Sequence, residues 1–364
     1  MHEVDQTGHA ASVIPPESGV SFVIPVLNER DYLQRAVDTV LEQDIDDQLE
    51  VILALGPSTD GTTELARSIA MRDDRIVLID NPAADIPVGL NLAIRASKYP
   101  TIVRVDAHSA LQPGYTRRAL ETLNRVGAAN VGGTMRADGK TTFQRAAARA
   151  YNSPFGLGGG AHHSGTKEGE ADTAYLGVMR RDVLDEVGLF DETIRRGEDW
   201  ELNLRIRRAG YRVWFDPALS VTYWPRDSWN WLVRQFYATG RWRGELVRRF
   251  GNVNSIKYFA PPGLIALILA ALVIGGLQLT GVISGLAAIL ASVVYLPLIA
   301  YVLIIAAVAI GTTGGSGLRD RMWTAVVLPS MHLAWGLGFI VGLVQGAGDT
   351  VDSSRVTGRY SPLP

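Results

Sequence analysis

Short apolar runs alternate with amphipathic stretches over the first part of the chain. Buried strands are predicted for the apolar runs 20–25, 49–55, 76–79 and 101–105. Apolar residues recur at helical spacing in the stretches 31–42 and 88–97 and in one that begins near Asp60. Alternation of this kind predicts an α/β fold, a mostly parallel sheet with helices on both faces.

A second half of this domain begins near Gly132. We expect a strand at 174–180, a short helix at 183–187, a helix from Gly197 to Gly210 and a strand at 211–215. Residues 156–160, with His162 and His163, form a Gly-rich loop. No GxGxxG or GxxxxGK[ST] sequence is present, so dinucleotide and P-loop chemistry are not supported.

The last part of the chain has a different pattern. From Tyr258 to Leu318 it contains no Asp, Glu, Lys, Arg or His. Apolar stretches at about 259–280, 282–310 and 323–346 predict three transmembrane helices, the second with a kink at Pro297. His332, in the third stretch, is either a lipid-phosphate contact or a residue packed between helices.

Positive residues predict how these spans are oriented. Arg248, Arg249 and Lys257 precede the first span, and Arg319 and Arg321 lie between the second and third. The polar segment 1–18 has no apolar stretch and reads as a disordered leader, not a signal peptide. We therefore expect a multi-pass plasma-membrane protein with a cytoplasmic polar domain, and a third span that leaves the tail 347–364 outside.

Composition excludes some function classes. The formal net charge of −2 argues against a protein that binds nucleic acid through a general basic surface. The absence of cysteine excludes thiolate nucleophiles, disulfides and Cys-ligated zinc.

Polar residues gather where the predicted strands end. Asn28-Glu29, Ser58-Thr-Asp60 and Asp106-Ala-His108 each follow an apolar run. Because ligands of open α/β sheets bind beyond the carboxyl ends of the strands, these residues mark the candidate site.

Five motifs, in this order and spacing, resemble glycosyltransferase family 2. They are Phe22-Val-Ile-Pro-Val-Leu-Asn28-Glu29, Ser58-Thr-Asp60-Gly-Thr, Gly89-Leu-Asn91, Asp106-Ala-His108 and Gly197-Glu198-Asp199. The resemblance covers about 19–250 and implies an inverting nucleotide-sugar transferase with the GT-A fold. Arg104-Val-Asp-Ala-His and the C-terminal spans are most similar to the succinoglycan-type glucosyltransferases, membrane proteins that extend lipid-linked saccharides.

The resemblance implies roles for the acidic residues. Asp199, with Glu198 beside it, would be the base that activates the acceptor hydroxyl. Asp106 and His108 occupy the metal-binding positions and would hold Mn²⁺ or Mg²⁺, with the histidine favouring Mn²⁺. The structural alternatives are acids that stabilise a helix N-terminus and a capping histidine.

Donor binding is implied for a larger set: Pro25, Asn28, Glu29, Asp60, Asn91, Asp106 and Arg241. Asp60 is also a plausible helix cap. Family members often carry two acids after the second strand, where this chain has Leu55-Gly-Pro57. That departure leaves the base of the donor open, and Asp85 is a candidate substitute.

The segment 224–250 mixes arginine with tryptophan. Gln235 and Arg241-Trp242 resemble a family element that closes over the acceptor and the diphosphate, although the gap between Gln and Arg-Trp is longer here. The alternative is an amphipathic helix at the membrane surface, and both interpretations can hold together.

The sequence thus predicts a membrane-anchored glycosyltransferase that moves a sugar from a nucleotide sugar to a lipid-linked saccharide. One alternative is transfer to polyprenyl phosphate, which is already ionised and needs no base. Another is a degenerate domain that binds nucleotide sugars without turnover. A transporter is poorly supported, because the spans contain no acidic residue.

Overall fold

The computed structural model describes residues 19–45, 48–157, 165–251, 256–311, 317–348 and 350. The predictions for the leader 1–18, for His162 and His163, and for most of the tail lie outside them. The chain forms two compact units. The sheet unit contains 19–137 and 165–224, and the helical unit contains 138–157 and 225–350 of the described residues.

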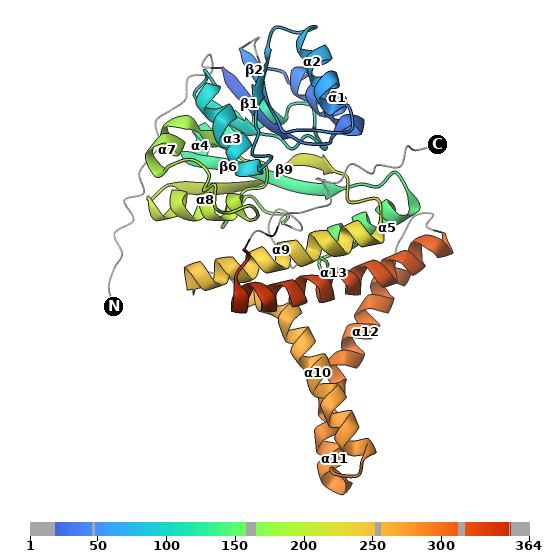
Figure 1. Ribbon diagram of the computed structural model, residues 1–364. Coiled ribbons are helices and arrows are strands. Elements are labelled where there is room, and N and C mark those ends of the chain that lie inside the picture. Colours follow the sequence, from blue (N-terminus) through green and yellow to red (C-terminus); the bar gives the residue numbers. More distant parts are fainter. Residues whose placement is uncertain are drawn as a thin grey trace, which may run out of the picture. The chain divides into compact units, whose positions relative to one another are not determined.

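The first half of the sheet unit is the predicted strand–helix alternation. Its elements are β1 (Val20–Val26), α1 (Arg30–Leu41), β2 (Leu49–Leu55), α2 (Thr62–Ala70), β3 (Ile76–Asp80), α3 (Ile86–Ala96) and β4 (Thr101–Arg104) (Figure 1). β1 pairs in parallel with β2 and β4, and β2 with β3. Four neighbouring strands therefore end at one edge of the sheet.

The second half makes the sheet mixed. Its elements are β5 (Ser109–Leu111), α4 (Tyr115–Val126), β6 (Ala128–Ala137), β7 (Gly169–Glu170), β8 (Val178–Arg180), α7 (Arg181–Val187), α8 (Glu198–Arg208) and β9 (Arg212–Tyr223). Among the described residues nine strands form one sheet in the order β3-β2-β1-β4-β8-β6-β9-β5, with β7 paired to β9. The strand predicted at 174–180 begins only at Val178, and the one predicted at 211–215 continues to Tyr223.

The core lies on both faces of this sheet. Phe22 and Ile24 of β1 belong to an apolar cluster that includes residues of α1, α2 and α4, whereas Val23 belongs to one that includes residues of α3, α7 and α8. This alternation follows from the two-residue period of a strand. Helices packed on both faces fix the loops at the strand ends.

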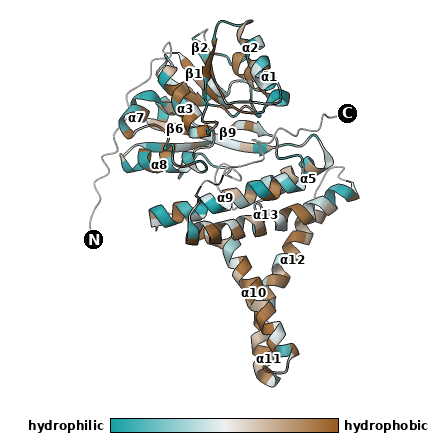
Figure 2. Cartoon of the chain, in the orientation of Figure 1, coloured by the Kyte–Doolittle hydropathy of each residue, from teal (hydrophilic) through white to brown (hydrophobic). Residues whose placement is uncertain are grey.

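The helical unit contains α5 (Thr142–Asn152), α9 (Trp229–Phe250), η2 (Ile256–Phe259), α10 (Ala260–Leu279), α11 (Gly285–Ala291), η3 (Ser292–Val294), α12 (Tyr295–Ile310) and α13 (Leu318–Gln345). Helical segments that are long and apolar enough to cross a membrane are Ile256–Leu279, Gly285–Ile310 and Leu318–Gln345. Figure 2 shows the apolar character of α10, α11 and α12. The prediction of three such helices is confirmed.

The second of these stretches is not one regular α-helix. The turn Ser292–Val294 is a 3₁₀ segment between α11 and α12. Pro297 follows it; it has no N–H for the carbonyl of Val293, and its ring crowds that carbonyl. The change in helix type therefore falls one turn before the proline.

Candidate active site

Asn28 joins the loops that follow β1 and β2. Its backbone has a left-handed φ of 53°, a conformation that asparagine tolerates better than most residues. Its Oδ1 accepts a hydrogen bond from the Thr59 amide at 2.8 Å, and its own amide donates to Ser58 Oγ at 3.0 Å. Pro25 lies upstream in β1, opposite Ala54 of β2. Asn28 thus fixes the shape of the edge where a donor is expected.

Asp60 organises the start of α2. One carboxylate oxygen accepts from the amide and the hydroxyl of Thr62, at 3.0 and 2.5 Å, and the other accepts from the Arg30 amide at 3.2 Å. The N-cap of α2 is Gly61, so Asp60 stabilises the turn that leads into the helix from the position before the cap. These contacts hold the carboxylate in the loop beside Asn28.

Glu29 and His108 form a buried pair. Both side chains are almost fully buried, and Nδ1 of His108 lies 3.0 Å from Oε1 of Glu29. The Glu29 amide donates to Thr62 Oγ1 at 2.8 Å, and the His108 ring packs edge-on against Tyr223 at 5.4 Å. A carboxylate on one ring nitrogen is the usual way in which proteins orient a histidine that binds metal through the other.

Arg104, the last residue of β4, is surrounded by three carboxylates. Its guanidinium donates to Asp199, and it lies 3.0 Å from Glu198 and 3.4 Å from Asp106. The Arg104 side chain is only 5% exposed. Within the described residues, its Nε is buried without a hydrogen-bond partner. One buried cation therefore links the end of β4 to the start of α8.

Glu198 and Asp199 occupy the first turn of α8, directly after Gly197, which has a φ of 82°. That position lets the N-terminal end of the helix stabilise negative charge. The Asp199 side chain remains 28% exposed, whereas Glu198 is 8% exposed. Asp199 is thus the more accessible of the two to a substrate.

The pKa values of Arg104 and Asp199 are both raised, but for different physical reasons. Burial raises the pKa of the Asp199 carboxyl to about 7, against the opposing effect of Arg104, and the charges of Glu198 and Asp106 add to the rise. Burial lowers the pKa of Arg104, but the three carboxylates outweigh it and leave that pKa raised. The cluster therefore combines a permanent cation with a carboxylate that exchanges its proton near neutral pH.

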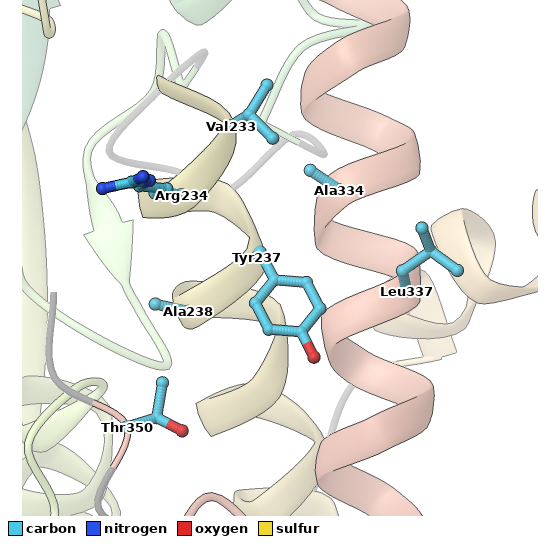
Figure 3. A pocket seen from close by; sticks show the side chains of 7 residues that line it. All are labelled: Val233, Arg234, Tyr237, Ala238, Ala334, Leu337 and Thr350. Atoms are coloured by element: carbon cyan, nitrogen blue, oxygen red, sulfur yellow. The ribbon is translucent and has the colours of Figure 1, made fainter. Parts of the chain in front are cut away.

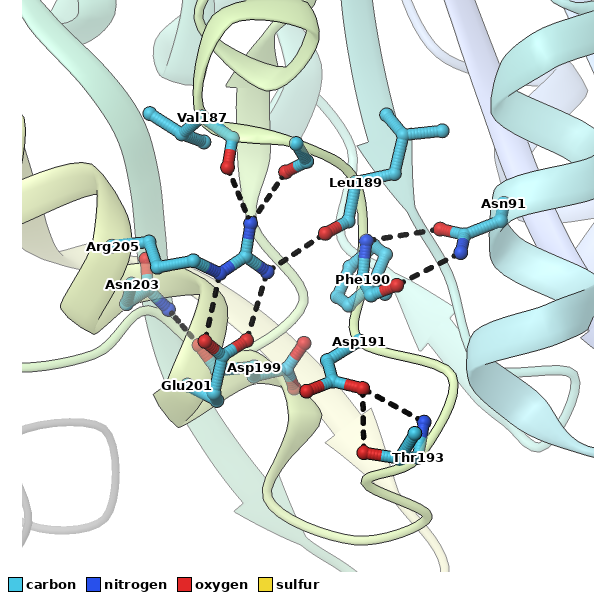
Figure 4. Close-up of polar contacts among 11 residues, drawn as sticks. Asn91, Val187, Leu189, Phe190, Asp191, Thr193, Asp199, Glu201, Asn203 and Arg205 are labelled. Atoms are coloured by element: carbon cyan, nitrogen blue, oxygen red, sulfur yellow. Dashed lines mark hydrogen bonds and ion pairs between the residues drawn. The ribbon is translucent and has the colours of Figure 1, made fainter. Parts of the chain in front are cut away.

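Asn91 positions the loop that leads to α8 (Figure 4). Its side-chain amide donates to the Phe190 carbonyl and to Glu192, both at 2.9 Å, and its Oδ1 accepts from the Phe190 amide at 3.0 Å. Asp85 reaches the same loop through an ion pair with Arg195 at 3.3 Å. The structure thus ties both residues to the loop before Glu198 and Asp199.

Arg205 holds the other side of this loop. Its guanidinium donates to the carbonyls of Val187, Gly188 and Leu189, each at 2.7 Å, and to both oxygens of Glu201 (Figure 4). Arg205 was not predicted as a site residue. Its signal in the sequence is an i,i+4 pair with Glu201, which is common on helix surfaces.

The remaining predicted residues lie on α9 in the helical unit. Arg241 Nε donates to the Gly346 carbonyl at 3.0 Å, and the indole of Trp242 donates to the Thr350 carbonyl at 2.9 Å. Gln235 accepts from the hydroxyl of Tyr151 at 3.4 Å. In this unit, Arg241 and Trp242 thus fasten the segment that follows α13 to α9.

The helical unit also contains a cavity of about 380 Å³ between α9 and α13 (Figure 3). It is lined by Val233, Arg234, Tyr237, Ala238, Ala334, Leu337 and Thr350. Its walls are mainly apolar, and Arg234 supplies a cation.

The protein's own donors for a metal ion are few. No group of three or more His, Asp or Glu side chains that would hold a metal is present in the described part of the chain. Of the two predicted ligands, Asp106 lies 3.4 Å from Arg104 and His108 lies 3.0 Å from Glu29. Such a pair fits a Mg²⁺ or Mn²⁺ ion whose remaining ligands are substrate phosphates and water.

Fold and site together define a GT-A-like domain with an acidic site at the carboxyl ends of its strands, and the described part of the helical unit adds three long apolar helices. The profile of the family described as "Glycosyl transferase family 2" matches residues 21–188. The succinoglycan biosynthesis protein ExoA of Rhizobium meliloti is 32% identical over 334 residues, which cover 87% of this chain and 93% of ExoA. The chain belongs to glycosyltransferase family 2, and the predicted resemblance is confirmed.

Two further comparisons agree. A dolichyl N-acetyl-α-D-glucosaminyl phosphate 3-β-D-2,3-diacetamido-2,3-dideoxy-β-D-glucuronosyltransferase of Methanococcus voltae is 24% identical over 70% of this chain and 82% of its own length. The mannosyltransferase PcManGT from Pyrobaculum calidifontis, solved in complex with GDP-Man and Mn²⁺, superposes with a TM-score of 0.56 at 19% identity, over 92% of this chain and 90% of that one. The latter likeness establishes the fold.

Proposed function

We propose that this glycosyltransferase is membrane-anchored and inverting, and that it moves a sugar from a nucleotide sugar to a lipid-linked saccharide. The observation that carries the proposal is the cluster of Arg104, Asp106, Glu198 and Asp199 at the strand ends, with one accessible carboxyl whose pKa is raised to about 7. The name of ExoA refers to polysaccharide synthesis, and that of the M. voltae relative to a lipid-linked sugar.

Asp199 acts as the general base. Its carboxylate takes the proton from the acceptor hydroxyl, and the oxygen attacks the anomeric carbon from the face opposite the diphosphate. The new glycosidic bond forms as the bond to the nucleoside diphosphate breaks, so the configuration inverts. Arg104 orients Asp199 and Glu198 without taking part in the proton transfer. A base with a pKa close to the working pH is well matched to this step.

Asp106 and His108 would hold a divalent cation, Mn²⁺ or Mg²⁺, that also binds the donor diphosphate. When bound, the cation neutralises the charge that develops on the leaving group. Glu29 orients the His108 ring through the 3.0 Å contact at Nδ1. That buried contact is the reason to assign Glu29 to the cation site in place of the nucleoside.

The donor nucleoside lies against the loops that Asn28 and Asp60 shape, with Pro25 beneath them in β1. Asn91 contributes indirectly, because it positions the loop before α8 through its hydrogen bonds to Phe190. Gln235, Arg241 and Trp242 contribute to closure over the acceptor and diphosphate when both substrates are bound.

The catalytic domain faces the cytoplasm from the plasma membrane. Arg248, Arg249 and Lys257 precede the first apolar helix, and Arg319 and Arg321 follow the second. Loops rich in Lys and Arg stay on the cytoplasmic side. Nucleotide sugars are made there, so the donor reaches the site without crossing the membrane.

One assay tests the proposal. Detergent-purified protein is incubated with UDP-, GDP- or dTDP-sugars, with Mn²⁺ or Mg²⁺ and a membrane lipid extract, and nucleoside diphosphate release is followed. We expect metal-dependent release with one class of donor, stimulated by the lipid and lost in Asp106→Ala. The absence of metal-dependent release with every donor would overturn the proposal.

A further inference from the structure

α13 packs against α9 at backbone contact over much of its length (Figure 1). A Cβ atom added to Gly338 would lie 2.1 Å from the Tyr237 carbonyl oxygen, and one added to Gly342 would lie 1.9 Å from that of Arg241. Trp229 also donates to Ser330 at 3.0 Å, near the start of α9. The residue numbers of the contacting pairs increase in the same direction along both helices, so α9 and α13 run parallel. The two helices must therefore lie at the same depth in a membrane.

α9 is a charged helix from its middle to its end. It carries Arg234, Arg241, Arg243, Glu245, Arg248 and Arg249. Charged side chains in the hydrocarbon core are costly, whereas amphipathic helices rich in Arg and Trp settle at the head-group level. A helix fastened along α9 is held at that level with it.

The first turns of α13 are fastened to a second charged helix, α5. Asp320 is buried and lies 3.0 Å from Arg149 and 3.6 Å from Arg145. Trp323 packs edge-on against Phe143 at 5.2 Å. Both halves of α13 therefore pack on polar helices.

α12, α10 and the turn η2 that precedes α10 contact α13 at His332, Gly336 and Phe339, in its second half. Phe259 packs on Phe339 at 5.3 Å, and Gly336 lies against the Pro261 carbonyl. The Tyr301 hydroxyl of α12 lies 2.8 Å from Nδ1 of His332. Beyond these contacts the two helices extend steeply away from α13 (Figure 1) and expose apolar side chains.

The outer face of α13 is an apolar stripe. It is formed by Leu318, Met322, Val326, Ile340 and Val344, which are all exposed and recur at helical spacing. A stripe of this kind on a helix whose other face packs on charged helices fits the boundary between head groups and acyl chains.

We propose that α13 lies in the membrane surface beside α9, and that only the hairpin of α10, α11 and α12 crosses the bilayer. The partner of the α13 stripe is the interfacial layer of the lipid. Both ends of α13 then lie on the side of the membrane that the sheet unit occupies. This placement replaces the third transmembrane span and the outside C-terminus that the sequence alone predicted.

The absence of cysteine makes a direct test possible. Single cysteines are introduced as Gly317→Cys and Gln345→Cys at the two ends of α13, as Thr280→Cys at the tip of the hairpin, and as Met71→Cys on the sheet unit. A Cβ atom added to Gly317 meets no other atom within 4 Å, and the other three residues are exposed. Each full-length variant is treated in intact and in permeabilised cells with a membrane-impermeant maleimide.

We expect Gly317→Cys and Gln345→Cys to be labelled under the same condition as Met71→Cys, and Thr280→Cys under the opposite condition. Labelling of Gln345→Cys together with Thr280→Cys would show that α13 crosses the membrane and would overturn the proposal. Labelling of Thr280→Cys together with Met71→Cys would overturn it too, because the hairpin would not cross. If a variant accumulates poorly, a fluorescent or alkaline phosphatase fusion at the C-terminus reports the same side.

Discussion

Arg104 is the residue through which the candidate active site is held together. Its buried guanidinium is shared by Asp106, which we assign to the cation, and by Glu198 and Asp199, which begin α8. Removing one partner from a buried ionic group leaves uncompensated charge. Arg104 therefore sets both the position of the base and the electrostatic field around it.

The pH dependence of the wild-type enzyme follows from Asp199. Because burial raises the pKa of this carboxyl to about 7, the active, deprotonated form is lost as the pH falls through that value. We expect kcat/KM to decline about tenfold per pH unit on the acid side. A profile of initial rates between about pH 5 and about pH 9 measures this, and a flat acid side would contradict the assignment.

Replacement of the base is the matching substitution. Asp199→Asn keeps the shape of the side chain but cannot accept the proton, so we expect the rate of transfer to a hydroxyl to fall by about 10²–10⁴. The same variant separates the alternative acceptor, because a polyprenyl phosphate needs no base. Full activity of Asp199→Asn with a hydroxyl acceptor would exclude Asp199 as the base.

Arg104→Gln tests the role of the cation. Arg104 lowers the pKa of Asp199 against the effect of burial, so its loss should move the acid limb of the kcat/KM profile to higher pH. Arg104→Lys, which keeps the charge, should restore part of the shift. Arg75→Gln removes a partly exposed arginine that pairs with Asp73 and serves as the control. An unmoved acid limb in Arg104→Gln would show that the residue has only a packing role.

The Glu29–His108 pair gives a prediction about the cation. If Glu29 orients the histidine ligand, Glu29→Gln should raise the Mn²⁺ concentration needed for half-maximal activity by about 10- to 100-fold, with a smaller effect at saturating metal. Titration of activity with Mn²⁺ checks this, with the exposed Glu42→Gln as control. An unchanged Mn²⁺ requirement would remove Glu29 from the cation site.

At the scale of elements, the parallel contact of α9 and α13 depends on glycines. Gly338→Ala and Gly342→Ala place a methyl group about 2 Å from backbone carbonyls of α9, and we expect each to lower stability by about 1–3 kcal/mol. Gly276→Ala, in α10, meets no atom within 4 Å and is the matched control. Thermal unfolding in one detergent compares them. Equal midpoints for all three variants would contradict the close packing.

The elements that the sequence predicted best are those with a simple local signal. β1 and β2 are short runs of apolar residues, buried almost throughout, and their bounds agree with the structure. β6 and the far half of β9 escaped prediction, because β6 contains adjacent glycines and β9 continues through Pro217. Their mutual pairing, with its register shifts, is a tertiary property.

Part of the site could also be predicted, because some of its residues have a simple local signal in the sequence. Asp106, Glu198 and Asp199 stand in short motifs, and the fold brings them together. Arg104 was not assigned a role, because its partners at 198 and 199 are distant in sequence. The alignment of α13 with α9 was hidden as well, since an apolar stretch of 28 residues has the same composition whether it crosses a bilayer or lies along a charged helix.

At the scale of the molecule, the chain combines a charged α/β unit with a helical unit that contains an uncharged hairpin. In the proposed reaction the donor is soluble and the lipid-linked acceptor is held in the bilayer. An enzyme that joins them needs both a polar site and a membrane anchor. The two units of this chain supply one each.

The most direct test of the central claim is the configuration of the product. A donor sugar carrying a label at its anomeric carbon is supplied to the protein in liposomes that contain the lipid acceptor, and the glycolipid is extracted and examined by NMR. The account predicts that the label enters the lipid fraction with inverted anomeric configuration, and that Asp199→Asn abolishes this transfer. Retained configuration, or release of the sugar into water with no labelled lipid, would contradict it.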